Sequence, residues 1–237
     1  MFYDQILSSI NSNYILILIP RIVSVLFIFL QVVGMFVYPG GTIHDITSEG
    51  YSFTSNFFSD MGAYAARNGE PNYLSMIFFS SSLNLVGITF SFYYCSLPEI
   101  LGNDKINYIL SWIGTFFALC GSICLIGTGL TPTDIVFDAH VLFANNIFYS
   151  FLITALCYTI VIYRSEILDK LYALGYLIFF ISIFMYVGVL QFGPSVNNGQ
   201  SALVFQVVAQ KLIVIVFVFT VLHQTFGFNK IKIDFSK

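Results

Sequence analysis

Long apolar runs alternate with shorter polar connections along most of the chain. Strands of a membrane barrel would alternate polar and apolar residues, and these runs do not. Because lipid cannot bond exposed amides, each run that is long enough to cross a bilayer, about 20 residues, is predicted to be a helix. The pattern predicts an all-α, polytopic integral membrane protein with one transmembrane domain, residues 1–237, built as a six-helix bundle. The predicted spans are residues 14–38, 73–95, 108–130, 138–163, 171–192 and 202–225.

The connection at residues 39–72 is much longer than the others. A loop of more than ~12 to 15 residues without structure of its own is unusual in a compact domain. Within it, at residues 54–67, Phe57, Met61 and Ala65 recur at helical intervals. We therefore expect a short interfacial helix in this first outer loop.

The composition supports a membrane location and removes one class of partner. Hydrophobic residues make up 57% of the chain and charged residues 9%, whereas a water-soluble domain carries about 25% charged residues. The net charge is −3, and no block of basic residues interrupts the chain. A nucleic-acid groove needs such a block. We therefore expect membrane lipid as a partner and no nucleic acid.

Lysine and arginine are distributed unequally between the two sides of the predicted bundle. The loops on one side hold only Arg67, while Arg21 and Lys211 lie within spans. Since cytoplasmic loops carry an excess of Lys and Arg, we predict a cell-membrane protein with cytoplasmic N- and C-termini. The basic residues on the predicted cytoplasmic side are Lys105, Arg164, Lys170, Lys230, Lys232 and Lys237.

Lys211 is a charged residue in the middle of an apolar predicted span. It follows Ala202 by nine positions, which places it ~14 Å into the sixth span at 1.5 Å per residue. An ammonium at that depth costs about 2.5 to 3.5 kcal/mol on insertion scales, so it should face the bundle interior and meet a carboxylate or water. Gln206 and Gln210 extend a polar stripe around it. Its acidic partner is then Asp60 or Asp138.

The fourth span carries a second group of polar residues. Asp138 and Asn145 share one helical face, and His140 lies about 200° away from Asp138, toward a neighbouring crevice. A buried ion pair of Asp138 with Lys211 that only fixes helix register is the alternative to a functional role. Asp134 either caps this helix or belongs to the site. Catalytic residues stay unassigned, and the candidate ligand-binding residues are Ser59, Asp60, Asp138, His140, Asn145, Gln206, Gln210 and Lys211.

The histidines raise the question of a metal. His223 lies at the far end of the sixth span, a hydrocarbon core of ~30 Å away from His44 and His140, so a site with all three is excluded. A two-histidine site of His44 and His140 with carboxylates, which could activate water for hydrolysis, stays open. No His-Glu-x-x-His or paired-cysteine motif favours it. We expect no metal and no cofactor.

The third span is rich in small residues. Cys120, Cys124, Gly114, Gly127 and Gly129 form a stripe that favours close helix packing. Packing within the bundle is the simplest use of this stripe. Contacts with another copy, in a helix-mediated oligomer, are the alternative.

Two segments resemble a known membrane family. Phe58-Ser-Asp-Met-Gly-Ala after the first span is similar to the Ser-Asp-Leu-Gly signature of the family called domain of unknown function 998, with Met61 in place of Leu. Leu130-Thr-Pro-Thr-Asp with Asp138-Ala-His140 resembles its acidic loop and histidine. A more distant likeness is to six-span proteins of the Frag1/DRAM/Sfk1 type, some of them linked to lipid handling. The resemblance implies an architecture and a candidate site, and no reaction.

These observations lead to three functional hypotheses. The first is binding of a lipid or amphiphile headgroup in an outward-facing polar crevice formed by Asp60, the start of the fourth span and the stripe around Lys211. The second is a proton-coupled small-molecule transporter in which Asp138 and Lys211 exchange protons. The third is a non-catalytic membrane scaffold. Whether the protein is an enzyme stays open, because neither a nucleophile nor a metal is established.

Overall fold

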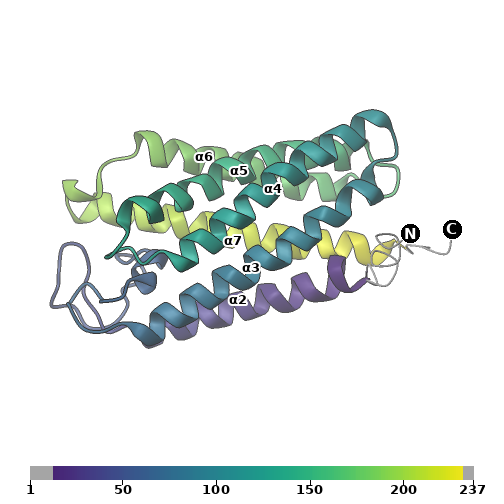
Figure 1. The fold of residues 1–237 in the computed structure, drawn as a ribbon. Coiled ribbons are helices and arrows are strands. Elements are labelled where there is room, and N and C mark those ends of the chain that lie inside the picture. The colour runs from purple at the N-terminus through teal and green to yellow at the C-terminus, as the bar shows by residue number, and fades with distance from the viewer. Residues whose placement is uncertain (1–12, 232–237) are drawn as a thin grey trace.

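The computed structural model describes residues 13–231, and this part of the chain is a bundle of six long helices (Figure 1). All six are long and apolar enough to cross a membrane. Between residues 13 and 231 the only β pairing is in isolated bridges. The predicted all-α, six-helix membrane fold is therefore confirmed. The elements are η1 (Tyr14–Leu18), α2 (Ile19–Phe36), η2 (Phe58–Gly62), α3 (Tyr73–Leu101), α4 (Lys105–Leu130), α5 (Phe137–Arg164), α6 (Leu171–Phe192), η3 (Val196–Asn198) and α7 (Gln200–Lys230).

The helices match the predicted spans, and several extend beyond them. The longest is α7, with 31 residues, which corresponds to ~46 Å at 1.5 Å per residue. Since a hydrocarbon core is ~30 Å thick, α7 is longer than is needed to cross it. Two residues of the basic set, Lys232 and Lys237, lie outside the described residues.

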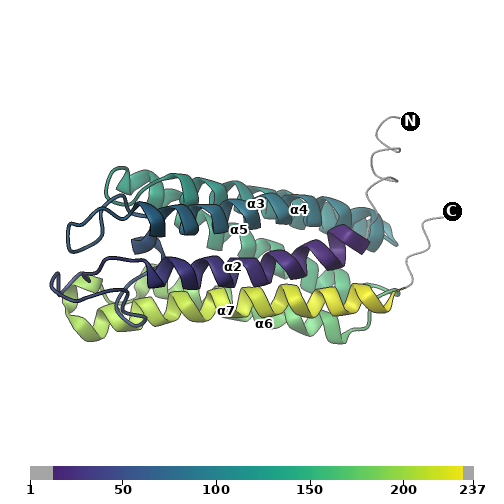
Figure 2. The same cartoon turned by 90° about the horizontal axis from the view of Figure 1, so that it is seen from below.

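The helices are arranged in a ring in which each packs against the next along the chain and α7 closes against α2. The first turn of η1 and the last turn of α7 lie at one end of the bundle, which we call the termini end (Figures 1 and 2). The connection between α2 and α3 covers the opposite end, the loop end. Arg21 helps to close the ring, because its Nε donates a hydrogen bond of 2.8 Å to Thr225 Oγ1 on α7.

The glycines of α4 allow the neighbouring helices to approach closely. A Cβ atom at Gly114 would lie 2.9 Å from the Tyr158 ring, and one at Gly121 would lie 2.8 Å from the Phe151 ring. On the other side, Gly129 faces α3. The glycines of this stripe pack against α3 and α5 of the same chain, as predicted, and the helix-mediated oligomer stays a prediction.

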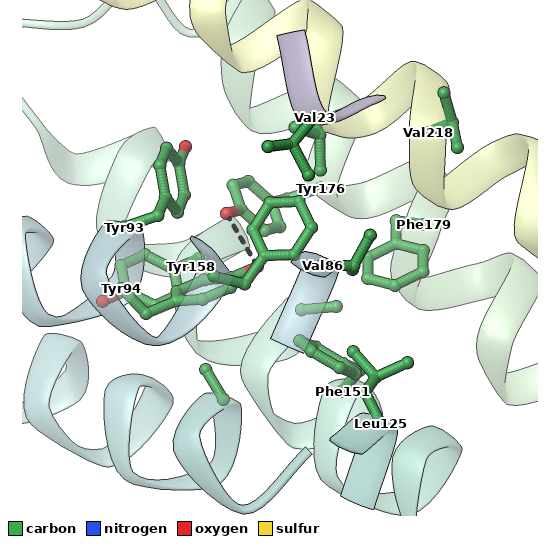
Figure 3. Packing of buried hydrophobic residues seen from close by; sticks show 14 of the residues in the cluster. Val23, Val86, Tyr93, Tyr94, Leu125, Phe151, Tyr158, Tyr176, Phe179 and Val218 are labelled. Atoms are coloured by element: carbon green, nitrogen blue, oxygen red, sulfur yellow. Dashed lines mark hydrogen bonds between the residues drawn. The ribbon is translucent and has the colours of Figure 1, made fainter. Parts of the chain in front are cut away.

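Aromatic side chains fill the centre of the bundle (Figure 3). The Phe217 ring lies within 5.5 Å, between centroids, of Phe90, Phe151 and Phe179, which come from three other helices. Beyond this phenylalanine layer, toward the termini end, lies a group of buried tyrosines. In this group, Tyr176 donates a hydrogen bond of 3.2 Å to the Tyr94 hydroxyl. Phe217 thus packs against rings from three other helices in the centre of the bundle.

The connection between α2 and α3 folds into the loop end of the bundle. The expected helix over residues 54–67 is shorter in the structure, a five-residue 3-10 helix, η2. The reason is that a side chain bonds the backbone groups that would continue it: Asn72 Nδ2 donates to the carbonyls of Met61 and Ala63, at 3.0 and 2.9 Å. Met61 is also fully buried, so this loop packs inward against the helices.

Candidate functional site

Lys211 lies on α7 beneath the loop, and its side chain is 2% exposed. The prediction that it faces the interior is confirmed. Its Nζ donates a hydrogen bond of 2.6 Å to the backbone carbonyl of Asn56. The ion pairs between side chains of the described residues join Arg67 to Asp60 and Arg164 to Asp104. Within this part of the chain, the ammonium of Lys211 is therefore held by a neutral group.

Three aromatic rings complete the surroundings of this ammonium. The Nζ atom lies 5.3 Å from the ring centroid of Tyr51, 5.1 Å from that of Phe53 and 5.0 Å from that of Phe58. All three distances fall within the ~6 Å range of a cation–π interaction. We call the three rings together with the Asn56 carbonyl the aromatic cage.

Asp60 lies next to the cage and is 2% exposed. Its Oδ1 accepts hydrogen bonds from Nε and Nη2 of Arg67, at 3.0 and 2.8 Å. Its Oδ2 accepts from Asn56 Nδ2 at 3.1 Å and from the Phe57 amide at 3.0 Å. Asp60 is thus the ion-pair partner of Arg67. Its negative charge still acts on Lys211 through space.

A close backbone crossing positions Arg67. Gly41 adopts φ +84°, and a Cβ atom there would lie 2.4 Å from the Asn68 amide nitrogen, so only glycine permits the approach. The Arg67 amide donates to the Tyr38 hydroxyl at 3.0 Å. Burial raises the pKa of Tyr38 to about 12, so this hydroxyl stays protonated at physiological pH.

The alternative in which Asp138 forms an ion pair with Lys211 is wrong. Asp138 begins α5 on its exposed side, whereas Lys211 is buried and bonded to Asn56. The predicted angular separation between Asp138 and His140 explains the outcome, because the turn of the helix that buries His140 points Asp138 outward. Asn145 lies further along α5 and is half-buried.

His140 is 3% exposed and has one partnered and one unpartnered nitrogen. Its Nδ1 lies 2.6 Å from the Thr131 carbonyl, and because a carbonyl can only accept, Nδ1 carries the hydrogen. In the neutral ring Nε2 is then an acceptor. Nε2 is buried and has no hydrogen-bond partner among the described residues. His140 also lies within electrostatic range of Asp60.

The remaining predicted site residues mainly hold the loop end together. Gln210 Oε1 accepts a hydrogen bond of 3.0 Å from the Phe58 amide, which docks η2 against α7. Gln206 Nε2 donates to the Pro194 carbonyl at 3.0 Å, and so fastens the connection from α6. Ser59 is half-buried on η2. Of the two glutamines in the predicted stripe, Gln210 alone bonds the loop that carries the cage.

Asp134 fastens the loop from the other side. It accepts hydrogen bonds of 2.9 Å from the amides of Tyr64 and Ala65, while the cap of α5 is Val136, without a side-chain bond. The capping role considered for Asp134 is therefore wrong. The carboxylate instead ties the turn before α5 to the loop.

The structure gives no support to a two-histidine metal site. His44 is exposed, and its Nε2 lies 2.8 Å from the Val196 carbonyl. Between residues 13 and 231, no group of three or more His, Cys, Asp or Glu side chains could hold a metal ion.

The sequence pattern did not identify the cage or the partner of Asp60. Tyr51, Phe53 and Phe58 come from an irregular loop, where spacing does not show which rings converge. One signal was present for Arg67, since it is the sole basic residue in the predicted outer loops. Arg67 is seven residues from Asp60 in the same loop, so it can reach that carboxylate more easily than Lys211 can from the sixth span.

Comparisons of the chain with protein-family models, curated proteins and solved structures found no match.

Proposed function

We propose that this membrane protein binds the negatively charged headgroup of a lipid or a similar amphiphile at its loop end, through Lys211 and Arg67. A charge imbalance carries the proposal. The one buried carboxylate beside the two cations, Asp60, is bonded to Arg67. Among residues 13–231, Lys211 is therefore buried without an anion of its own. A phosphate or carboxylate from a ligand would supply it.

The energetics of Lys211 favour exchange of its present contacts for an anion. Placing an ammonium inside a membrane costs ~2.5 to 3.5 kcal/mol on insertion scales. Three cation–π contacts of ~0.5 to 2 kcal/mol each offset that cost in the unliganded protein. A charged acceptor forms hydrogen bonds about twice as strong as neutral ones. Binding requires Lys211 Nζ to leave its hydrogen bond with the Asn56 carbonyl.

The proposal also covers the orientation of the bundle in the membrane and the resemblance of the segment around Asp60 to a known family. The described basic residues at the termini end support a cytoplasmic location for that end, so that the loop end faces outward in the cell membrane. The likeness of the segment around Asp60 to the domain of unknown function 998 family, and to six-span proteins linked to lipid handling, agrees with a lipid ligand.

Lipid titration with native mass spectrometry tests this function. The purified protein is titrated with phosphatidylglycerol and, as an uncharged reference, with diacylglycerol. Lys211→Met and Arg67→Gln should each weaken phosphatidylglycerol binding at least about tenfold, which corresponds to 1.4 kcal/mol, and leave diacylglycerol unchanged. Lys170→Met, at the termini end, is the matched control. Unchanged phosphatidylglycerol binding in both loop-end variants would refute the proposal.

One observation favours a second candidate, a proton-coupled transporter. His140 has an unpartnered Nε2 and lies within electrostatic range of Asp60, so these two groups can take the place of Asp138, which is exposed and does not pair with Lys211. In liposomes loaded with a pH-sensitive dye, the wild-type protein would then conduct protons and His140→Phe would not. Equal proton flux in empty and protein-containing liposomes would exclude this candidate.

A further inference from the structure

The surroundings of Lys211 differ from those of the other cations that contact rings. Lys170, Lys230 and Arg21 each lie over a single ring, at 4.9, 5.7 and 4.7 Å from its centroid. Lys211 is enclosed by three rings at nearly equal distances and by a carbonyl oxygen at 2.6 Å. Several aromatic rings around one ammonium are the arrangement that proteins use to recognise alkylammonium ligands.

The cage is organised by bonds that do not involve Lys211. The Tyr51 hydroxyl donates to the Asn56 carbonyl at 2.9 Å, and the Ser52 amide donates to Asn56 Oδ1 at 2.9 Å. Asn56 Nδ2 is bonded in turn to the Gly41 carbonyl and to Asp60. The turn that carries Tyr51 and the carbonyl therefore keeps its shape without the lysine. Pre-organisation of this kind lowers the cost of binding a ligand.

The cage has an inner and an outer side. Lys211 enters from α7 and is 2% exposed, whereas Phe53 is 54% exposed. Phe53 is therefore the outer wall of the cage. A group approaching the loop end meets this ring first.

We infer that the aromatic cage is a binding site for the alkylammonium group of a ligand, and that Lys211 occupies it as a tethered substitute in the unliganded protein. The inference rests on the proposed function and specifies its ligand. When the ligand's ammonium enters the cage, Lys211 is displaced and becomes available to the ligand's phosphate. The ligand class is thus a headgroup with a phosphate next to an ammonium, as in ethanolamine and choline phospholipids.

Pairing of charges supports this class. The phosphate of such a headgroup can pair with Lys211, which has no anion of its own among the described residues. Its ammonium can take the place of Lys211 between the three rings. A cation alone would add a positive charge beside Lys211 and Arg67, and an anion alone would leave the cage without a cation once Lys211 moves out.

Removal of the tethered substitute tests the cage directly. Lys211→Ala leaves a cavity that is lined by the three rings. Choline should bind this variant at least about tenfold more tightly than its neutral carbon isostere, in which a carbon replaces the nitrogen, as measured by the shift in thermal unfolding midpoint. Lys170→Ala, which vacates a single ring, should show no such preference. Equal binding of choline and the isostere to Lys211→Ala would overturn the inference.

A second variant decides the question if Lys211→Ala does not fold. Phe53→Leu changes a largely exposed ring, and Phe192→Leu is its control, since Phe192 is 90% exposed at the same end of the bundle. In native mass spectrometry, Phe53→Leu should weaken binding of phosphatidylethanolamine and phosphatidylcholine at least about threefold and leave phosphatidylglycerol unchanged. Equal binding of all three lipids to the wild type and to Phe53→Leu would refute the cage.

The outcomes separate this inference from the proposed function. Lys211-dependent binding of phosphatidylglycerol, without any effect of Phe53→Leu on choline or ethanolamine lipids, would leave the proposed function standing and remove the cage. Choline selectivity of Lys211→Ala, with phosphatidylglycerol binding unchanged in both Lys211→Met and Arg67→Gln, would support the cage and refute the proposed function. Tighter binding of phosphatidylcholine than of free choline to the wild type identifies a lipid as the source of the ammonium, and the opposite order identifies a free amine.

Discussion

Replacement of Asp60 by Asn should destabilise the protein more than any other single change of an acidic side chain discussed above. The carboxylate accepts four hydrogen bonds, two on each oxygen. An Asn side chain keeps one oxygen and places an amino group against two donors, whichever way it is turned. In addition, Arg67 and Lys211 lose the nearby negative charge.

The magnitude follows from burial and geometry. Removing one partner of a fully buried ion pair costs ~3 to 5 kcal/mol. Here Asp60 is buried, but the Arg67 side chain is 41% exposed, so water screens part of the interaction. We therefore expect Asp60→Asn to lower the free energy of unfolding by about 2 to 4 kcal/mol.

Unfolding of the purified protein in mixed micelles, titrated with a denaturing detergent and followed by circular dichroism, measures this change. Asp138→Asn is the matched control, because Asp138 is exposed, and it should stay within about 0.5 kcal/mol of the wild type. If Asp60→Asn were as stable as Asp138→Asn, Asp60 would not be a buried acceptor of the Arg67 guanidinium.

Three further predictions concern packing, pH and orientation. Gly87→Ala places a Cβ atom 2.8 Å from the Ser122 carbonyl oxygen and should cost ~1 to 3 kcal/mol, whereas Gly188→Ala, with nothing within 4 Å, should be neutral or stabilising in the same unfolding titration. A hydrogen bond from the Asn107 amide lowers the pKa of Asp104 below its usual 3.8. The charged carboxylate therefore stabilises the fold above pH 3.8, and this stabilisation is lost as the pH falls through the lowered pKa. In Asp104→Asn the free energy of unfolding should depend less on pH in this acid range. A cysteine replacing Thr54, after removal of the four native cysteines, should react with a membrane-impermeant maleimide on intact cells. Labelling only after permeabilisation would show that the loop end faces the cytoplasm.

The fold could be predicted because lipid restricts the choice of structure. A run of Ile, Val and Phe is ambiguous between strand and helix in water, but in a bilayer the backbone must bond within its own segment. For the same reason the span of residues 171–192 was predicted with its observed bounds. The ends of α7 are harder to predict. The hydrophobic pattern stops where the sequence becomes polar, but the helix continues through those polar residues.

The candidate site could be predicted only in part. Burial of Lys211 follows from the cost of exposing an ammonium to lipid, and it is observed. The prediction that its partner is Asp60 or Asp138 is wrong, because the long irregular loop brings the Asn56 carbonyl to Lys211 and pairs Asp60 with Arg67. That loop brings Arg67 to Asp60 through a glycine crossing at Gly41, which hydrophobic periodicity does not encode.

An experimental structure of the protein reconstituted with a phospholipid would locate the headgroup relative to Lys211. We expect headgroup density at the loop end, with a phosphate oxygen within hydrogen-bonding distance of Lys211 Nζ and with Lys211 no longer bonded to the Asn56 carbonyl. Lipid density confined to the outer faces of the helices, with Lys211 still bonded to the Asn56 carbonyl, would contradict it.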